Sequence, residues 1–391
     1  GGGAFLVPYI LFIVLFGLVG LSAEFAIGRR ARTGTWAPMN IAGKNRKGQA
    51  GVFPGLDSSS GFFRYRHWVC HYRGLGGKSL AGSVTGAILT ADAAAYFSQA
   101  TGEFGSVPWH VLVVVTAAGI LMFGATKGIE KINKVLMPSF FVLFAILAIR
   151  VAFLPGAAEG YKFLFAPDWS DLLKVDTWVM AMGQAFFSLS ITGSGMIVYG
   201  TYLAKTEDIP SIHPYCFFDT VAAMMAALAI MPAVFAFGIE PNAGPPLMFI
   251  TLPEIFRQMP MGRLFAVIFF LSVAFAGITS LINMFEAVSE SWQNRFKLPR
   301  KAAVALCSGI ALLVGIFLES EPKVGSWMDS SPLLWCPSAQ CWGCTIYYIL
   351  GYKEIREELE EGRKKPLGEF FGPLARYVYV PLAVIVFIAG V

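Results

Sequence analysis

The sequence is dominated by apolar runs that are long enough to cross a lipid bilayer as helices. About 20 apolar residues are needed to span about 30 Å of hydrocarbon in helical form. The runs occupy about 4–23, 107–125, 133–154, 177–204, 216–238, 261–289, 302–318 and 374–391. Because 56% of the residues are hydrophobic and only 14% are charged, an ordinary soluble domain is excluded. We predict an all-α fold, a polytopic transmembrane helix bundle in which residues 1–391 form one domain.

Clusters of Lys and Arg predict which loops face the cytoplasm, because positive charge is retained on that side of the membrane. One cluster, at 29–47, follows the first apolar run, and another, at 127–134, follows the second. Two consecutive runs cannot both end inside, so a further crossing is expected between about 48 and 106. The basic loop at 353–365 similarly requires 332–350 to cross. The prediction is ten crossings, in a chain that starts outside.

Two of these required crossings have an unsuitable composition. The stretch 52–81 contains arginines, a lysine and histidines, which are costly in hydrocarbon, and 331–344 is rich in Cys, Ser, Trp and Pro. A one-base slip converts the codons of apolar residues into those of Ser, Cys, Trp and Tyr, so we hypothesise local frameshifts at both places. The start Gly-Gly-Gly-Ala-Phe, without an initiator Met, indicates that a preceding helix has been lost.

Several other function classes are disfavoured by the sequence. The net charge of +5 comes from short clusters between apolar runs, so we expect membrane lipid and no nucleic acid as a partner. Three short motifs resemble a phosphate loop, an iron–sulfur run and a metal cluster, but each is incomplete or lies in a segment of unsuitable composition. They are Gly74–Ser79, then Cys336 with Cys341 and Cys344, and His67 with Cys70 and His71.

Polar residues at membrane depth identify a candidate site. The run 183–195 places hydroxyls and glycines in the middle of an apolar stretch, which is typical of an unwound helix that exposes backbone groups to ions or carboxylates. Close packing of small residues is the alternative. A second such place is 276–280, with two adjacent hydroxyls, and Asp219 is a further intramembrane acid. Oxygen ligands of this kind suit a hard cation.

Blocks of this sequence resemble the neurotransmitter:sodium symporter family. GGGAFLVPYI with EFAIGR is similar to the second helix of that family, KGIEKINKVLMP to the start of the fifth, GQAFFSLS to the sixth, FITLPEIF to the fourth extracellular loop, and FAGITS to the eighth helix. The resemblance implies an inverted-repeat, leucine-transporter-like fold of two five-helix repeats plus two helices. Helices two to eleven are represented and the first is missing.

The resemblance also implies roles for individual residues. Sodium ligands would be Ala276, Thr279, Ser280, Ser188 and Asp219. Substrate would contact Phe187, Ser190, Ile191, Gly193, Ser280 and Met284. Tyr9, Gln184, Ser188 and Asp219 would supply the negative charge that chloride provides in animal relatives. Phe187 and Asp329 would form the extracellular gate, while Asn294 stands where the family has a cytoplasmic gate acid.

The function implied is sodium-coupled symport of a neutral amino acid by alternating access. The expected location is the plasma membrane, which in a bacterium is the inner membrane. Na⁺ is the coupling ion, whereas chloride dependence, sodium stoichiometry and oligomeric state are left open. One alternative is an inactive, truncated or frameshifted remnant of a transporter. A remote one is an intramembrane enzyme, which is disfavoured because it would need paired catalytic groups at membrane depth, and the candidate site residues identified there include one acid, Asp219.

Overall fold

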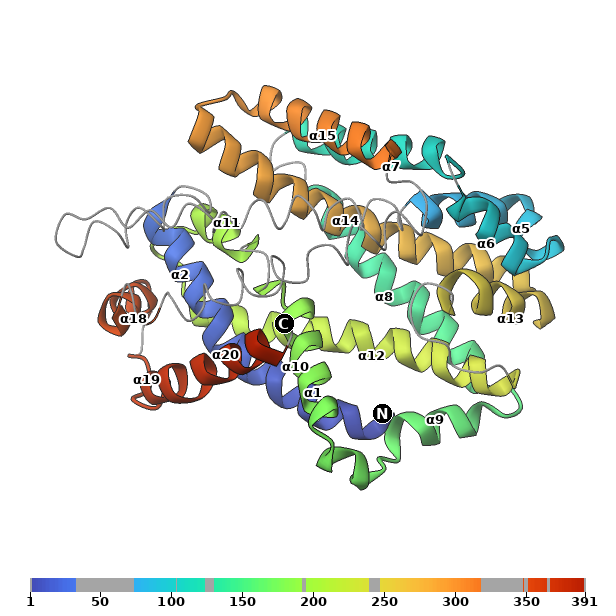
Figure 1. Cartoon of the computed structure of the whole chain (residues 1–391), viewed down its shortest axis with the longest axis horizontal. Helices are drawn as coiled ribbons and strands as arrows, with labels where there is room; N and C mark the ends of the chain where they lie inside the picture. Colours follow the sequence, from blue (N-terminus) through green and yellow to red (C-terminus); the bar gives the residue numbers. More distant parts are fainter. Residues whose placement is uncertain are drawn as a thin grey trace.

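The computed structural model describes residues 2–32, 74–102, 104–123, 130–191, 195–238, 247–317, 347, 351–363 and 366–389. Within these ranges the regular structure is helical (Figure 1). The elements are α1 (Gly3–Phe16), η1 (Gly17–Leu21), α2 (Ser22–Ala31), a helix at 74–85, α5 (Ala87–Thr90), α6 (Ala93–Thr101), α7 (Val107–Met122), α8 (Glu130–Ala152), α9 (Ala157–Phe165), η3 (Trp169–Leu173), α10 (Val175–Ser188), α11 (Gly195–Tyr202), η5 (Ile209–Ile212), α12 (His213–Ala236), η6 (Leu247–Thr251), α13 (Leu252–Gln258), α14 (Gly262–Phe296), α15 (Arg300–Phe317), α18 (Tyr352–Glu360), α19 (Phe371–Pro373), η8 (Leu374–Tyr379) and α20 (Val380–Ala389).

Five helices in the described ranges are long and apolar enough to cross a membrane. They are Gly3–Ala31, Asn133–Ala152, Ile209–Ala236, Gly262–Asn294 and Arg300–Phe317. The shorter apolar helix Val107–Met122 corresponds to another predicted run. The predicted runs at these six places are therefore helical, and five of the helices are long enough to cross a membrane. The predicted crossing at 332–350, the suspect stretch 331–344 and Asp329 lie outside the described residues, as does most of 52–81.

Two predicted segments prove more structured than the sequence patterns indicated. The acid-rich loop 155–176 contains α9 and η3, and α9 packs along α12. Gly160 makes this possible, because a Cβ at that position would lie 2.4 Å from Pro232 Cα. The stretch 48–106, expected to supply one crossing, contains in its described part the helix at 74–85 followed by the short helices α5 and α6.

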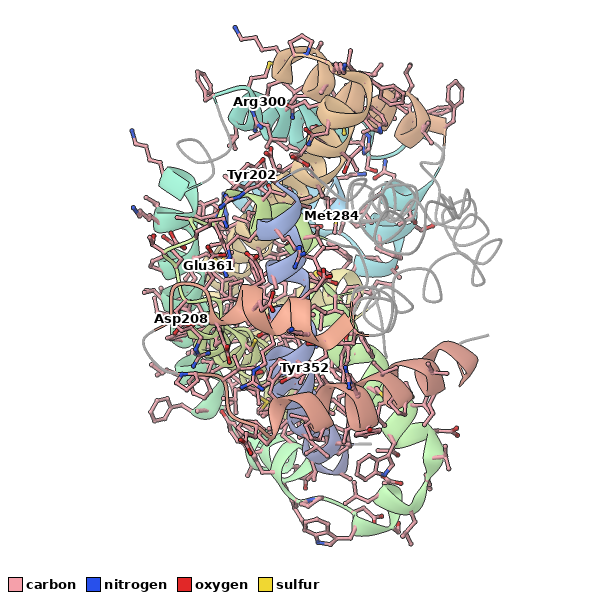
Figure 2. All side chains as sticks on the ribbon, turned by 90° about the vertical axis from the view of Figure 1, so that its left-hand side faces the viewer. Tyr202, Asp208, Met284, Arg300, Tyr352 and Glu361 are labelled. Atoms are coloured by element: carbon pink, nitrogen blue, oxygen red, sulfur yellow. The ribbon has the colours of Figure 1, made fainter. Side chains whose placement is uncertain are left out.

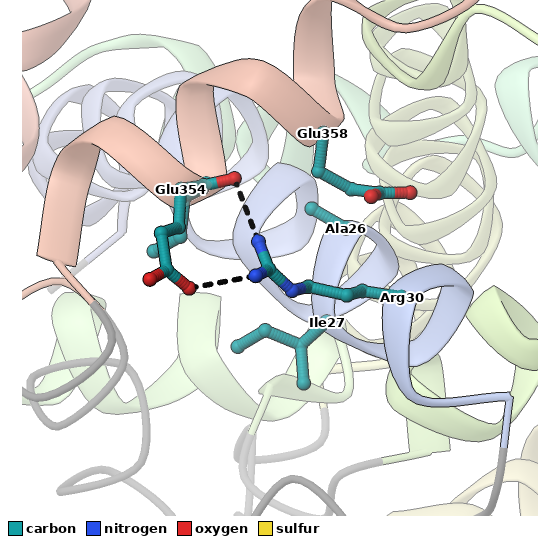
Figure 3. A pocket seen from close by; sticks show the side chains of 6 residues that line it. Ala26, Ile27, Arg30, Glu354 and Glu358 are labelled. Atoms are coloured by element: carbon teal, nitrogen blue, oxygen red, sulfur yellow. Dashed lines mark hydrogen bonds and ion pairs between the residues drawn. The ribbon is translucent and has the colours of Figure 1, made fainter. Parts of the chain in front are cut away.

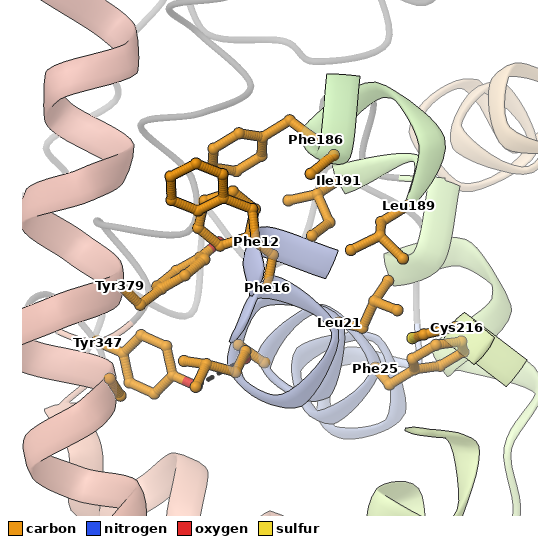
Figure 4. Close-up of a cluster of buried hydrophobic side chains, with 14 of the residues drawn as sticks. Phe12, Phe16, Leu21, Phe25, Phe186, Leu189, Ile191, Cys216, Tyr347 and Tyr379 are labelled. Atoms are coloured by element: carbon orange, nitrogen blue, oxygen red, sulfur yellow. Dashed lines mark hydrogen bonds between the residues drawn. The ribbon is translucent and has the colours of Figure 1, made fainter. Parts of the chain in front are cut away.

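One buried cluster joins the continuous helix α1–η1–α2 to α10, α11 and the C-terminal helices (Figure 4). Phe16 stacks on Phe186 with ring centroids 4.3 Å apart, and Tyr379 packs edge-on against Phe16. The Tyr347 hydroxyl donates a hydrogen bond of 2.9 Å to the Val19 carbonyl. We call this cluster the aromatic core. The aromatic core holds both α10 and α11 against α1 and α2.

A second buried cluster, which we call the α14 core, joins α14 to α7 and α15. Its α14 members Leu281, Ile282 and Phe285 are fully buried. A third cluster packs α8, α12 and α13 against the first half of α14. Figure 1 shows the resulting arrangement, with α7, α14 and α15 along one side of the molecule and α1, α2 and α10 on the other. The region between α11 and α14 therefore lies between the aromatic core and the α14 core, while α12 contributes to both the aromatic core and the third cluster.

Helices α2 and α11 approach each other through glycines. A Cβ at Gly28 would lie 1.9 Å from the Ile197 carbonyl oxygen, and a Cβ at Gly200 would lie 2.6 Å from the Phe25 carbonyl oxygen. No side chain larger than hydrogen fits at either position without moving a backbone. This crossing holds α11 directly on α2.

The predicted cytoplasmic end of α2 is tied to α18 by charge (Figure 3). The Arg29 side chain is completely buried, and its Nε lies 2.7 Å from Glu358 Oε1. Its other guanidinium nitrogens donate to the backbone carbonyls of Glu207, Glu358 and Glu361. Arg30 pairs with Glu354 at 2.8 Å beside a small, shallow pocket. This pocket is lined by α2 and α18 and lies away from the predicted site.

Helix α18 is also stabilised internally. Arg356 donates to Glu360 at 2.9 Å, and this bond lowers the pKa of the Glu360 carboxyl below its ordinary value. The basic loop predicted at 353–365 contains α18, and its acidic residues contact α2 and the loop after α11.

Candidate functional site

The interrupted helix at 175–202 is the centre of the candidate site. Helix α10 ends at Ser188, the chain turns through Ser190 with a left-handed φ of 56°, and α11 begins at Gly195. The carbonyls that end one helix and the amides that begin the next have no partner within their own helices. The predicted break is thus confirmed, and it presents a negative and a positive dipole end near each other along the chain.

Three helices meet at Ser188. The Tyr9 hydroxyl of α1 donates to Ser188 Oγ at 3.3 Å, and Ser188 Oγ in turn donates to a carboxylate oxygen of Asp219 on α12. The predicted set of Tyr9, Ser188 and Asp219 is therefore brought together. Gln184, one turn before Ser188 on α10, has an exposed side chain. Asp219 lies within a membrane-spanning helix, so its carboxylate requires partners such as this hydroxyl or a cation.

The predicted oxygen cluster on α14 also forms. The carbonyl oxygen of Ala276 accepts hydrogen bonds from Thr279 Oγ1 at 3.0 Å and from Ser280 Oγ at 2.9 Å. Three oxygen atoms therefore gather within one turn of a helix in an apolar span. A carbonyl and two hydroxyls are ligands of the type that a hard monovalent cation accepts.

The predicted substrate-contacting residues differ in their surroundings. Phe187 is 48% exposed, and Ser190, Ser280 and Met284 are partly buried. Ile191 is 1% exposed and belongs to the aromatic core. A Cβ at Gly20 would lie 3.0 Å from the Ile191 Cδ1 atom, so Ile191 packs between α10 and η1. Gly193 and Asp329 lie outside the described residues.

Sequence reasoning missed a polar seam between α11 and α14. Tyr199 donates to Asn283 Oδ1, and Tyr202 donates to Glu286 Oε1. Glu286 is fully buried and forms a two-point ion pair with Arg300, the first residue of α15, with N–O distances of 2.9 and 2.6 Å. Figure 2 shows Tyr202 and Arg300 at the same end of the molecule. A charged residue inside the apolar run 261–289 was the signal that would have identified Glu286.

Asn294, which stands where the family has a cytoplasmic gate acid, contacts a carboxylate one turn earlier on α14. Asn294 donates its side-chain amide to the Glu290 carboxylate at 2.5 Å, and Glu290 is buried. Glu290 therefore places a carboxylate one turn before the position that the resemblance indicated.

The geometry defines a multi-pass membrane protein whose central helix is interrupted beside clustered oxygen ligands. A model of the Sodium:neurotransmitter symporter family matches residues 90–387, and the chain belongs to that family. The crystal structure of MhsT in complex with L-phenylalanine superimposes with a TM-score of 0.86 at 28% identity, covering 100% of this chain and 92% of that one. This similarity confirms the leucine-transporter-like fold.

Curated relatives agree with this assignment. An uncharacterized sodium-dependent transporter of Bacillus subtilis, YhdH, is 33% identical over 81% of this chain and 70% of its own length. The rat sodium-dependent neutral amino acid transporter B(0)AT1 is 24% identical over 92% of this chain and 72% of its own length. The protein is therefore a membrane transporter of a sodium-dependent family, and it is not an enzyme.

Proposed function

We propose that this protein couples the entry of Na⁺ to the uptake of a neutral amino acid across the plasma membrane. The observation that carries the proposal is the interrupted helix α10–α11 at Ser190, in a molecule that also gathers oxygen atoms at Ser188 and Asp219 and at Ala276, Thr279 and Ser280. Interrupted helices of this kind provide ion and substrate sites at the bilayer midplane.

Two sodium positions are proposed. At the first, the Ala276 carbonyl and the hydroxyls of Thr279 and Ser280 would turn their lone pairs toward the ion, and the hydroxyl hydrogens can rotate to permit this. At the second, Ser188 and Asp219 would contribute a hydroxyl and a carboxylate. Because Asp219 is anionic when it binds a cation, this position also offsets the cost of a charge within the membrane.

The amino acid would bind at the interruption. Its carboxylate suits the start of α11, since the positive end of a helix dipole favours an anion. Phe187, Ser190, Gly193, Ser280 and Met284 would contact the remainder of the substrate, with Phe187 and Asp329 as gate residues. Ile191 would act at the edge of this site, from its position in the aromatic core.

A neutral substrate is supported by two similarities. One relative carries the name of a neutral amino acid transporter, and the MhsT crystal structure contains L-phenylalanine. The group of Tyr9, Gln184, Ser188 and Asp219 would provide fixed negative charge, so we propose that transport proceeds without chloride.

The test is uptake of labelled neutral amino acids by proteoliposomes that contain the protein expressed from its complete gene. Uptake is expected with an inward sodium gradient and to be lost when potassium replaces sodium. Asp219→Asn and Ser280→Ala should each reduce sodium-dependent uptake at least tenfold.

Ser308→Ala is the matched control, because Ser308 makes the same type of bond, to the Val304 carbonyl one turn earlier, but lies on α15 in the α14 core region. Its uptake should equal that of the wild type. Equal uptake in sodium and potassium gradients for every amino acid tested would refute the proposal.

A further inference from the structure

The hydrogen bond between Tyr199 and Asn283 joins α11, which packs on the aromatic core, to α14. Tyr199 packs against the aromatic core, and the neighbours of Asn283 on α14, Ile282 and Phe285, belong to the α14 core. Among the described side chains, hydrogen bonds run from α11 to α14 at Tyr199 to Asn283 and at Tyr202 to Glu286. Any movement of α11 relative to α14 must stretch or break these bonds.

Asn283 shares a helix face with the oxygen cluster on α14. It follows Ala276 by seven residues, Thr279 by four and Ser280 by three, and these spacings place all four on one side of a continuous α-helix. Both hydroxyls of the cluster bond back to Ala276, toward the start of the helix. The side-chain amide of Asn283 therefore lies one turn beyond the proposed sodium ligands, and its hydrogen-bond partner is Tyr199.

A displacement of Tyr199 also moves the start of α11, where the substrate is proposed to bind, because α11 is short and is held on α2. Tyr199 lies within the eight-residue helix Gly195–Tyr202, only four residues after the amides that open that helix. The close approach of Gly28 to Ile197 and Gly200 leaves α11 little freedom to move independently of α2. Displacement of Tyr199 therefore displaces the start of α11 as well.

We propose that Asn283 is a positioning residue that, through Tyr199, couples sodium binding on α14 to the position of α11. This inference rests on the proposed function and deepens it. When the Ala276 face is ordered by an ion, the Asn283 amide is held in the orientation that accepts the Tyr199 hydroxyl, and α11 is held with it. Coupling of this kind is reciprocal, so loss of the bond must weaken sodium binding even though neither residue is an ion ligand.

The test is a double-mutant cycle with sodium itself as the probe. Thermal unfolding of the purified protein in detergent is followed while NaCl replaces KCl at constant ionic strength, and the sodium concentration that gives half of the stabilisation is measured. The variants are Tyr199→Phe, Asn283→Ala and the double mutant. Each single variant should raise this concentration about fivefold or more, and the double mutant should raise it no further than the larger single effect.

Tyr377→Phe is the matched control, because Tyr377 is 73% exposed on η8, and it should leave the sodium dependence unchanged. If Asn283→Ala fails to fold, Asn283→Ser replaces it in the cycle. Additive effects, or single variants with wild-type sodium dependence, would overturn the coupling role and leave the proposed function standing. A wild-type protein that sodium does not stabilise, and that shows no sodium-dependent uptake, would overturn both.

Discussion

The contact between Gly28 and α11 gives a prediction with a magnitude that follows from the geometry. A methyl group at position 28 would lie 1.9 Å from the Ile197 carbonyl oxygen and 2.8 Å from its carbonyl carbon. Both obstacles are backbone atoms, so no side-chain rotation relieves the overlap. Helices α2 and α11 would have to separate by about 1 Å, and overpacking of this size costs about 1–3 kcal/mol.

Gly28→Ala also removes a glycine from a helix, which by itself contributes about 0.5–1 kcal/mol of stability. The net expectation is a loss of about 1–2 kcal/mol, or about 2 °C in Tm for a chain of this size. Gly309→Ala in α15 is the matched control, because a Cβ there has nothing within 4 Å, and the substitution should be neutral or stabilising.

The assay is thermal unfolding of both variants in the same detergent, with sodium-dependent uptake measured in parallel. Sodium-dependent uptake by Gly28→Ala should fall by more than the loss of folded protein accounts for, because α11 carries the amides proposed to bind the substrate carboxylate. If Gly28→Ala is as stable as Gly309→Ala, the close helix crossing is wrong and α11 is not held by α2.

Two further predictions concern stability. Glu358→Ala should cost about 3–5 kcal/mol and abolish the monodisperse peak in size-exclusion chromatography, because it leaves the Arg29 guanidinium buried without its carboxylate. Glu361→Ala, which removes only an exposed pair with Lys205, should behave as the wild type, and equal elution profiles for the two variants would contradict this reasoning. Gly160→Ala should force α9 away from Pro232 and speed tryptic cleavage in the loop 155–176. The control is Gly119→Ala, because a Cβ at Gly119 would have nothing within 4 Å. Equal cleavage rates for the two variants would show that α9 is not packed on α12.

Whether a feature of this structure could be predicted from the sequence depends on how far apart its residues are in the chain. The break in 175–202 was predictable because hydroxyl and glycine residues in the middle of an apolar run are a local signal. The grouping of Tyr9, Ser188 and Asp219 came from family resemblance, since these residues are distant in the chain. Their hydrogen bonds are confirmed, while their roles in binding remain predictions.

The features that could not be predicted are contacts between residues far apart in the chain, which no local sequence pattern contains. Tyr199 and Asn283 are 84 residues apart, and each alone is an ordinary polar residue in a helix. Similarly, hydrophobicity at Ile191 suits either a substrate site or a buried core, and only the packing around Gly20 shows that it belongs to the aromatic core. The ion pairs of α18 were hidden for the same reason, because Arg29 and Glu358 are 329 residues apart.

The burial of Arg29 also determines when the end of α2 can pack during synthesis of the protein. Arg29 is synthesised 329 residues before its carboxylate partner Glu358, and two of its carbonyl partners lie between residues 358 and 361. Until the ribosome has passed that point, α2 has at its end a guanidinium that cannot be enclosed without an uncompensated charge. The end of α2 must therefore stay hydrated, and open to chaperones and proteases, while the intervening residues are made. Closure of α18 over Arg29 then marks a chain that has been synthesised as far as α18.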